Sequence, residues 1–195
     1  FDNQGHIVGQ NRCFESAQGE WVLFVANDVR LQPRCLKGLW GLRDNGLFPS
    51  AVGQFQPALF QVSGIPDQMG MDWRWPGYGI SRKHFLGNQI PITPSSCYLM
   101  KKALWSTLEG FDEQLLTSHE DVDFGLRLKA AGYWNLCRYS SQAIHLGNAT
   151  LRHQPSHNRR AFHRDRMYVI RKHYQGLDYW SRYLAIQLLD HLPRF

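Results

Sequence analysis

The chain reads SHEDVDFGLRLKAAGY from Ser118 to Tyr133, and this stretch decides how the rest of the sequence is interpreted. Val122 and Leu126 lie about one helical turn apart, a spacing that predicts an α-helix. Gly132 suits the position just beyond that helix, because glycine adopts the left-handed conformation without steric cost. Three acids stand in the first turn, where the helix dipole favours carboxylates: Glu120, Asp121 and Asp123. Ordinary first-turn acids would look the same, so the function must be inferred from the flanking sequence.

Composition narrows the class of protein. With 195 residues, 43% of them hydrophobic and 19% charged, the chain predicts one globular domain with a sizeable core. A formal net charge of +6 favours an anionic partner, which leaves a phosphorylated substrate, nucleic acid and a membrane surface open. The four cysteines form no CxxC pair, so a reduced, cytoplasmic setting fits them better than a disulfide framework.

The start of the chain carries no recognisable targeting segment. The longest strongly apolar run, residues 21–26, is far shorter than the ~20 residues that span a bilayer. The chain does not start with Met, and residues 1–9 are mostly polar and contain glycine. We therefore expect an N-terminal piece of the domain to be absent.

Strand and helix patterns alternate along the chain, which predicts an α/β fold. The run EWVLFVA at residues 20–26 is almost entirely apolar, as in a strand that is buried on both faces of a parallel sheet. Residues 61–92 show no regular pattern, and long irregular segments in compact domains are usually functional or mobile. Further strands are expected at residues 51–59, 95–100, 134–139 and 142–146. Further helices are expected at residues 11–18, 33–44, 102–108, 157–174 and 179–192.

Asp28 and His145 are candidate metal ligands. Asp28 follows the first apolar strand, and ligands of open α/β sheets gather beyond the carboxyl ends of strands. An Asp in this place also caps turns. His145 ends a short strand in AIHLG, where it is either a satisfied core residue or, beside an Asp-bound cation, a further ligand. Mg²⁺ or Mn²⁺ is the cation that would share such oxygen ligands with a substrate phosphate.

The acids of the predicted helix divide by position. Glu120 and Asp123 share one helix face, while Asp121 points elsewhere. One carboxylate can therefore meet a substrate while its neighbours brace the helix. Asp123 is spaced four residues before Arg127, which predicts a salt bridge between them.

Taken in this order, the residues resemble the motifs of inverting glycosyltransferases of family 2, rhamnosyltransferases among them. LFVANDVRLQP at residues 23–33 resembles the family's metal-binding segment, and the upstream Gly5, Asn11-Arg12 and AQGE at 17–20 resemble its lead-in. GFDEQLLTSHEDVDFGLRLKAAGY is similar to the family's GGFDE…EDVDxxLRxxxxGY block, and AIHLG to its late H-x-G. The resemblance covers about residues 5–147, and its specific part is the pair of GFDE and EDVDF blocks.

The resemblance implies a GT-A fold, a Rossmann-like α/β structure with a mostly parallel sheet flanked by helices, here N-terminally incomplete. It implies that Asp121 is the general base for the acceptor hydroxyl and that Glu120 lies beside it at the acceptor. It also implies that Asp28, with His145 as a further ligand, binds Mn²⁺ or Mg²⁺ on the donor diphosphate. The nucleotide would lie near four residues: Asn11, Arg12, Asn27 and Asp28. Ala26 departs from the family, which often has Asp or Asn there.

The same resemblance implies the domain boundaries and the partners. The catalytic core would be residues 1–150 without its first strands, and residues 151–195 a basic, amphipathic helical extension. The partners would be a nucleotide-sugar donor and a glycan or lipid-linked acceptor of cell-envelope polysaccharide assembly. Trp73 and Trp75 either stack on an acceptor sugar or pack their loop. The basic tail either contacts lipid phosphates at the inner face of the membrane or is an ordinary solvated helix face.

Two alternatives of other classes remain open. A basic nucleic-acid-binding module would account for the charge and the basic C-terminal region. It leaves the acids at 120–123 unexplained, because carboxylates repel phosphate unless a metal intervenes, so no nucleic acid is expected as a partner. An inactive transferase-like domain that only binds sugar would account for Ala26 and the missing start.

Overall fold

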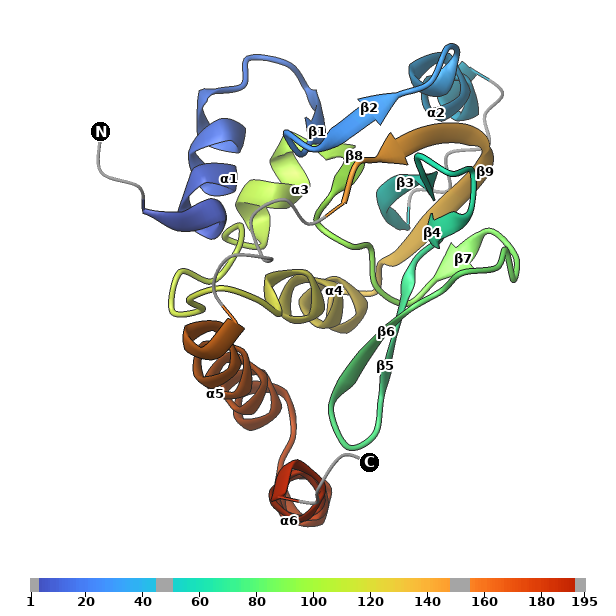
Figure 1. Ribbon diagram of the computed structural model, residues 1–195. Helices are drawn as coiled ribbons and strands as arrows, with labels where there is room; N and C mark the ends of the chain where they lie inside the picture. Colours follow the sequence, from blue (N-terminus) through green and yellow to red (C-terminus); the bar gives the residue numbers. More distant parts are fainter. Residues whose placement is uncertain (1–3, 45–50, 148–154, 192–195) are drawn as a thin grey trace.

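A mixed β-sheet forms the centre of the molecule (Figure 1). The computed structural model describes residues 4–44, 51–147 and 155–191. Within these ranges the main strands lie in the order β1 (Trp21–Val25), β8 (Cys97–Lys101), β3 (Val52–Gln61), β9 (Trp134–His145) and β2 (Val29–Leu31). Two short strands extend the sheet, β4 (Pro66–Gln68) beside β3 and β7 (Gln89–Ile90) beside β9. A separate hairpin consists of β5 (Met71–Arg74) and β6 (Tyr78–Ser81).

The prediction of a mostly parallel sheet is wrong. In the described part of the chain β3 and β9 form the parallel pair, and the other strand pairs are antiparallel. β1 pairs antiparallel with β8, although its sequence is typical of a parallel strand. The reason is that both faces of β1 are covered, since Phe24 packs into one hydrophobic cluster and Trp21 into another. Burial on both faces, rather than parallel pairing, produces the continuous apolar run.

Helices cover the two faces of the sheet (Figure 1). α1 (Gly5–Ser16), α3 (Lys102–Thr107) and α4 (Glu120–Ala130) share a large aromatic core with the even-numbered residues of β8. In that core the ring of Phe14 stacks on Trp105 with centroids 3.9 Å apart. α2 (Cys35–Asp44) covers the opposite face, where Cys35 and Leu39 are fully buried.

Two segments differ from the sequence-based expectation. The two short strands expected at 134–139 and 142–146 are one strand, β9, whose pairing with β3 jumps from Arg138 opposite Pro57 to Gln142 opposite Ala58. The extra residues interrupt the alternating side-chain pattern of β9, so the sequence alone predicts two strands instead of one. The irregular segment 61–92 contains four short strands, β4 to β7.

The two C-terminal helices, α5 (Pro155–His173) and α6 (Gly176–His191), extend away from the sheet toward the β5–β6 hairpin (Figure 1). Trp73 of the hairpin donates its indole N–H to the Tyr174 hydroxyl at 3.0 Å. Trp75 and the Ser181 hydroxyl are 3.4 Å apart, and Arg182 donates to the Pro76 carbonyl at 3.2 Å. In the described residues, none of the helices is both long and apolar enough to cross a membrane.

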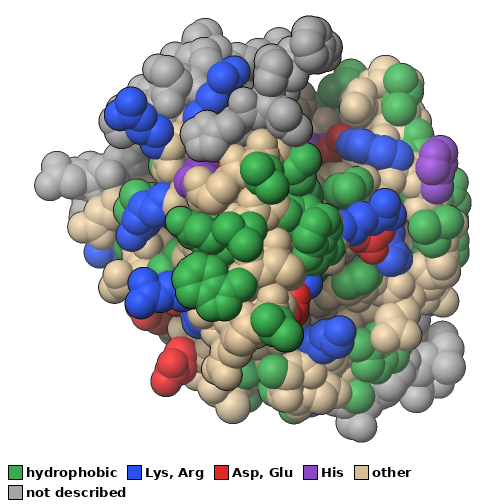
Figure 2. All heavy atoms as spheres, turned by 90° about the horizontal axis from the view of Figure 1, so that it is seen from below, with side chains coloured by type: hydrophobic (Ala, Val, Ile, Leu, Met, Phe, Trp, Pro, Cys, Tyr) green, Lys and Arg blue, Asp and Glu red, His purple; other side chains and the backbone are tan. Residues whose placement is uncertain are grey.

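One face of α6 is apolar and exposed. Figure 2 shows hydrophobic side chains gathered at the middle of this side of the molecule, with Lys and Arg on both flanks. Four of the exposed large side chains of α6 recur at helical spacing: Leu177, Trp180, Leu184 and Leu188. Trp75 of the hairpin is also more than half exposed. We call Trp75 and these four side chains the α6 patch.

A buried carboxylate joins α5 to the loop before α4. Asp165 is fully buried and accepts backbone N–H groups from Leu116, Thr117 and Ser118 at 2.8–3.1 Å. Arg164 also donates to it, at 3.1 Å. Asp165 thus binds the chain immediately before the acids at 120–123, and it is the one acid of an otherwise basic segment.

We expect Asp165→Ala to lower the free energy of unfolding by about 2 to 3 kcal/mol, because several charge-assisted hydrogen bonds are lost together. Asp178→Ala is the matched control, since Asp178 is half exposed and its side chain pairs with the neighbouring Arg182 on the same helix. That variant should lose about 0.5 kcal/mol or less. Urea unfolding of the three proteins measures both losses, and equal losses would contradict the anchoring role of Asp165.

Candidate active site

The head of α4 forms a compact acid turn, defined here as His119, Glu120 and Asp121. His119 precedes the helix with φ of 66°, a left-handed conformation that non-glycine residues rarely adopt. Its ring is buried between Trp73 and Phe162. Burial therefore lowers the pKa of His119 to about 4, so the imidazole is neutral at physiological pH. The turn is held in place by packing around a neutral ring.

The two carboxylates of the acid turn have different surroundings. Glu120 is buried, and its Oε1 accepts the Ser95 hydroxyl at 2.6 Å and lies 3.1 Å from Nε2 of His6. Burial opposes ionisation of Glu120, but His6 and Ser95 together hold its pKa below the ordinary value. Asp121 instead accepts hydrogen bonds from the backbone of Val122 and Ser95. Burial and the neighbouring charge of Glu120 raise the pKa of Asp121 to about 8.

Asp123, one turn further along, has a structural role. Its fully buried carboxylate contacts Arg127 at 2.8 Å and both Lys172 and His173 of α5 at 2.8 Å. Burial opposes its ionisation, yet these cationic partners lower the pKa of Asp123 to about 2. The predicted Asp123–Arg127 salt bridge is therefore confirmed, and Asp123 attaches α4 to α5.

A second cluster lies where β2 meets β9. The antiparallel register places His145 opposite Val29, the residue after Asp28. Nε2 of His145 is 3.3 Å from Oδ2 of Asp28, and the Asp28 carbonyl accepts the Leu146 N–H at 2.7 Å. On its other side, Nδ1 of His145 is 2.6 Å from Oδ2 of Asp67. The structure thus brings Asp28 and His145 together and adds Asp67.

The Asp28–His145 pair fits a divalent cation. Two ligand atoms bound about 2.1 Å from one ion at right angles would lie about 3 Å apart, close to the separation seen here. Among the described residues no group of three or more His, Cys, Asp or Glu side chains is arranged as a complete metal site. A cation held by this pair would therefore need further oxygen ligands, as Mg²⁺ obtains from substrate phosphates and water.

Ser95 and Ser96 connect the two clusters. The Ser95 hydroxyl donates to Glu120, and its backbone hydrogen-bonds to the carboxylate of Asp121. The Ser96 hydroxyl is 3.1 Å from the side-chain oxygen of Gln68, the neighbour of Asp67, and its carbonyl accepts the Ala26 N–H at 2.8 Å. The acid turn and the Asp28–His145–Asp67 cluster therefore lie on either side of two consecutive residues.

The expected nucleotide contacts separate in the structure. The side-chain amide of Asn11 is buried and bonds to the backbone N–H and carbonyl of Phe111 and to Glu113 at 2.8–2.9 Å. These contacts occupy the amide and attach α1 to the GFDE segment. Arg12 and Asn27 have exposed side chains, and Asn27 adjoins Asp28 in the turn between β1 and β2.

The two tryptophans also have different positions. Trp73 lies against the acid turn, with its ring centroid 5.7 Å from that of His119, and its indole N–H is bonded to Tyr174. Trp75 points to α6 and belongs to the α6 patch. Trp73 is therefore the one of the pair that contacts the acid turn.

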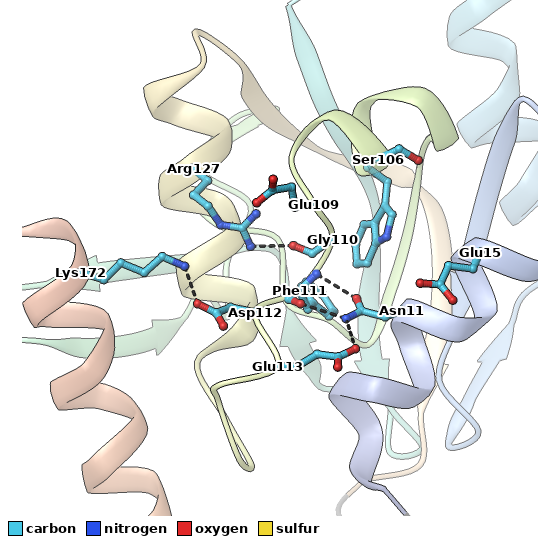
Figure 3. A pocket seen from close by; sticks show the side chains of 11 residues that line it. Asn11, Glu15, Ser106, Glu109, Gly110, Phe111, Asp112, Glu113, Arg127 and Lys172 are labelled. Carbon is cyan, nitrogen blue, oxygen red and sulfur yellow. Dashed lines mark hydrogen bonds and ion pairs between the residues drawn. The ribbon is translucent and has the colours of Figure 1, made fainter.

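A pocket of about 650 Å³ opens beside the GFDE segment and not at either cluster (Figure 3). Its charged lining is mainly acidic, with Glu15, Glu109, Asp112 and Glu113. Its cations, Arg127 and Lys172, are already paired, Lys172 with Asp112 at 2.7 Å. A mainly acidic lining whose cations are paired does not suit an anionic donor.

Comparison with known proteins identifies the family. The family model described as "Glycosyl transferase family 2" matches residues 2–108, which is more than half of the chain. The chain belongs to glycosyltransferase family 2. The match includes Asn11, Arg12, Asn27 and Asp28 and ends before the acid turn.

Relatives and solved structures agree with this family. The O-antigen biosynthesis protein RfbC of Myxococcus xanthus is 28% identical over 156 residues, which covers 73% of this chain and 12% of RfbC. A mannosyltransferase of Pyrobaculum calidifontis, solved with GDP-Man and Mn²⁺, matches 98% of this chain with a TM-score of 0.55 and 13% identity. GalNAc-T7, solved with UDP, GalNAc and Mn²⁺, matches 73% with a TM-score of 0.60 and 13% identity. The chain spans 50% of the former and 30% of the latter, and at this identity the likeness shows the GT-A-like fold.

Sequence reasoning missed three residues of the two clusters: His6, Asp67 and Ser95. Asp67 lies in the segment without periodicity, and its proximity to His145 depends on the pairing of β4 with β3. Ser95 lies at the start of the run 95–100, in which the apolar residues predicted a strand and nothing indicated a role for the serine. His6 lies in α1, which begins at Gly5, six residues before the expected start.

We expect the carboxylates of Asp121 and Asp123 to change the stability of the protein in opposite directions at neutral pH. Asp121 has a pKa of about 8 in the folded protein against an ordinary 3.8, so its ionisation costs stability that is lost as the pH rises from about 4 to 8. Asp121→Asn should therefore raise the thermal midpoint at pH 7 by a few degrees, since roughly 1 kcal/mol shifts a domain of this size by about 2–4 °C. The gain should vanish near pH 4.

Asp123→Asn is the matched control two residues away. Because the pKa of Asp123 is lowered to about 2, its ionised form stabilises the fold above pH 4, and that contribution disappears as the pH falls toward 2. This variant should have a lower midpoint at pH 7. Thermal scans of both variants from pH 3 to 8 measure the two effects, and a destabilised Asp121→Asn at neutral pH would contradict the assignment.

Proposed function

We propose that this chain is the catalytic part of an inverting glycosyltransferase. It moves a sugar from a nucleoside diphosphate donor to a hydroxyl group of a glycan or lipid-linked acceptor by a metal-assisted single displacement. The observation that carries this proposal is the placement of the two clusters on either side of Ser95 and Ser96. One cluster suits the leaving diphosphate and the other suits the attacking hydroxyl.

Asp28 and His145 are the residues that would hold a divalent cation at the donor diphosphate. Such a cation neutralises the charge that develops on a leaving nucleoside diphosphate. Asn27 and the exposed Arg12 are the candidates for contact with the nucleotide. Mn²⁺ is the cation in two of the solved structures of similar fold, which supports the same choice here.

Asp121 is the proposed general base. A base is most effective when its pKa lies near the working pH, and burial together with Glu120 raises the pKa of Asp121 to about 8. Its carboxylate would take the proton of the acceptor hydroxyl as that oxygen forms the bond to the anomeric carbon. Glu120, held ionised by His6 and Ser95, would bind the acceptor beside it.

The acceptor is proposed from three features. Trp73 contacts the acid turn and offers an aromatic edge for a sugar, and Trp75 offers a second aromatic ring in the α6 patch. The similarity to an O-antigen biosynthesis protein favours a growing glycan or its lipid-linked form as the acceptor. The exposed Arg159, Arg160 and Arg171 of α5, together with the exposed apolar face of α6, favour peripheral contact with anionic lipid at the cytoplasmic face of a membrane.

The proposed donor site is tested by calorimetric titration of the chain with UDP, GDP and dTDP, each with and without Mn²⁺. We expect one nucleotide to bind more tightly with Mn²⁺, and Asp28→Ala should remove most of the Mn²⁺-dependent gain. Glu20→Ala is the control, because Glu20 is exposed on the far end of β1. Equal Mn²⁺ dependence in wild type and Asp28→Ala would contradict the role of Asp28.

The proposed role of Asp121 at the acceptor is tested with Asp121→Asn, which removes the base while preserving the size of the side chain. Removal of a general base typically costs 10²–10⁴-fold in rate, so transfer should fall by about that factor. Donor affinity should stay within about twofold of wild type, because Asp121 lies in the other cluster. Transfer is measured by release of the nucleoside diphosphate; normal turnover would refute the assignment, and donor binding without turnover in wild type would favour an inactive sugar-binding domain.

A further inference from the structure

His145 is held from both sides by carboxylates on different parts of the chain. Its Nε2 faces Asp28 at 3.3 Å, and its Nδ1 faces Asp67 at 2.6 Å. The His145 and Asp67 side chains are only 11% and 14% exposed, so water competes weakly for this short contact. Asp28 comes from the turn after β1 and Asp67 from β4, in the segment that showed no sequence pattern.

The chemistry of the short contact fixes where one proton lies. An ionised carboxylate only accepts hydrogen bonds, so a nitrogen 2.6 Å from it must carry the hydrogen. Nδ1 of His145 is therefore the donor, and Nε2 is directed at Asp28. A histidine that binds a metal commonly donates its other ring N–H to a carboxylate, which sets the tautomer and the ring orientation.

We propose that Asp67 is a positioning residue that holds His145 with Nε2 presented to the cation site formed with Asp28. This inference rests on the proposed function, because it takes Asp28 and His145 as the cation ligands. In this role Asp67 orients the imidazole and does not itself bind the metal.

The other partner of Asp67 supports orientation over ligation. Lys83 lies 3.0 Å from Oδ1 of Asp67 and donates to its backbone carbonyl at 2.6 Å. With His145 on Oδ2, both carboxylate oxygens are engaged within the protein. The charge of Lys83 also offsets that of Asp67, whereas Asp28 has no Lys or Arg within ion-pair distance among the described residues.

The fold holds Asp67 rigidly enough for this task. β4 pairs with β3, with Gln68 opposite Leu59 and Pro66 opposite Phe60. The next residue, Gln68, bonds to Gln56 through its carbonyl and contacts Ser96 through its side chain. Asp67 is therefore supported by sheet pairing and by the same Ser96 that contacts the strand leading to Asp28.

The experiment compares two substitutions at Asp67 in the full chain. Asp67→Ala removes the acceptor, so His145 should lose its fixed tautomer and Mn²⁺ affinity should fall about 10- to 100-fold. Asp67→Asn keeps a side-chain oxygen that can accept the N–H of Nδ1. Lys83 can still bond to the backbone carbonyl of residue 67, so that side-chain oxygen stays available to His145. It should keep the tautomer and most of the affinity, whereas a lost metal ligand would make the Asn variant as weak as the Ala variant.

Two measurements are made on each protein. Long-range ¹H–¹⁵N correlation of the imidazole ring reports the His145 tautomer without any metal, and electron paramagnetic resonance of free Mn²⁺ reports affinity for Mn²⁺ alone. Asp72→Asn is the matched control, because Asp72 is similarly shielded and pairs with Arg82 and Arg74 instead of a histidine. It should change neither readout.

The outcomes separate this inference from the proposed function. If Asp28→Ala and His145→Ala leave Mn²⁺ affinity unchanged, the cation site itself is wrong and both proposals fall. If those variants weaken Mn²⁺ binding while Asp67→Ala does not, only the role of Asp67 is overturned. An unchanged His145 tautomer in Asp67→Ala would likewise overturn it, whatever the metal does.

Discussion

The site depends on two consecutive serines. Ser95 is bound to both acids at the head of α4, and Ser96 is bound to the segment that carries Asp67 and to the strand that leads to Asp28. In the proposed reaction one cluster binds the donor diphosphate and the other the acceptor hydroxyl, so both must face the same sugar. A pair of adjacent residues is the shortest rigid link that a chain offers between them.

The acid turn shows how the fold supports an unfavourable arrangement. Two neighbouring carboxylates resist joint ionisation, and His119 adopts a left-handed backbone conformation just before them. The cost is offset nearby: Asp165 binds three backbone N–H groups of the preceding loop, and Asp123 binds cations of α4 and α5. Several basic residues of α5 that looked like a surface patch in sequence form ion pairs within the protein. Arg164 pairs with Asp165, Lys172 with Asp112 and Asp123, and Arg166 with Asp190 of α6.

The sequence predicted the parts of the site that local pattern determines. The helix at 120–130, the Asp123–Arg127 pair and the placement of Gly132 follow from spacing along one helix, and all three are present. The proximity of Asp28 and His145 was implied only by family resemblance, and the register of β2 and β9 provides it. Asp67 and His6 could not be predicted, because neither lies in a periodic pattern and each reaches its partner across more than 70 residues.

Sheet direction was mispredicted for a physical reason. An apolar run records that both faces of a strand are covered, and it carries no information on the direction of the neighbouring strand. β1 is covered by α1, α3 and α4 on one side and by α2 on the other, so its composition matches that of a parallel strand although it pairs antiparallel with β8.

The central claim is a single displacement, with a carboxylate at the acid turn activating the hydroxyl and a cation at Asp28 and His145 assisting departure of the diphosphate. The most direct test is the anomeric configuration of the sugar at the moment of transfer, followed by ¹H NMR with whichever nucleotide sugar the chain turns over. The account predicts that the first product has the inverted configuration at the anomeric carbon. A first product with retained configuration would contradict it, because retention requires a second displacement or a front-face mechanism for which the acid turn is not arranged.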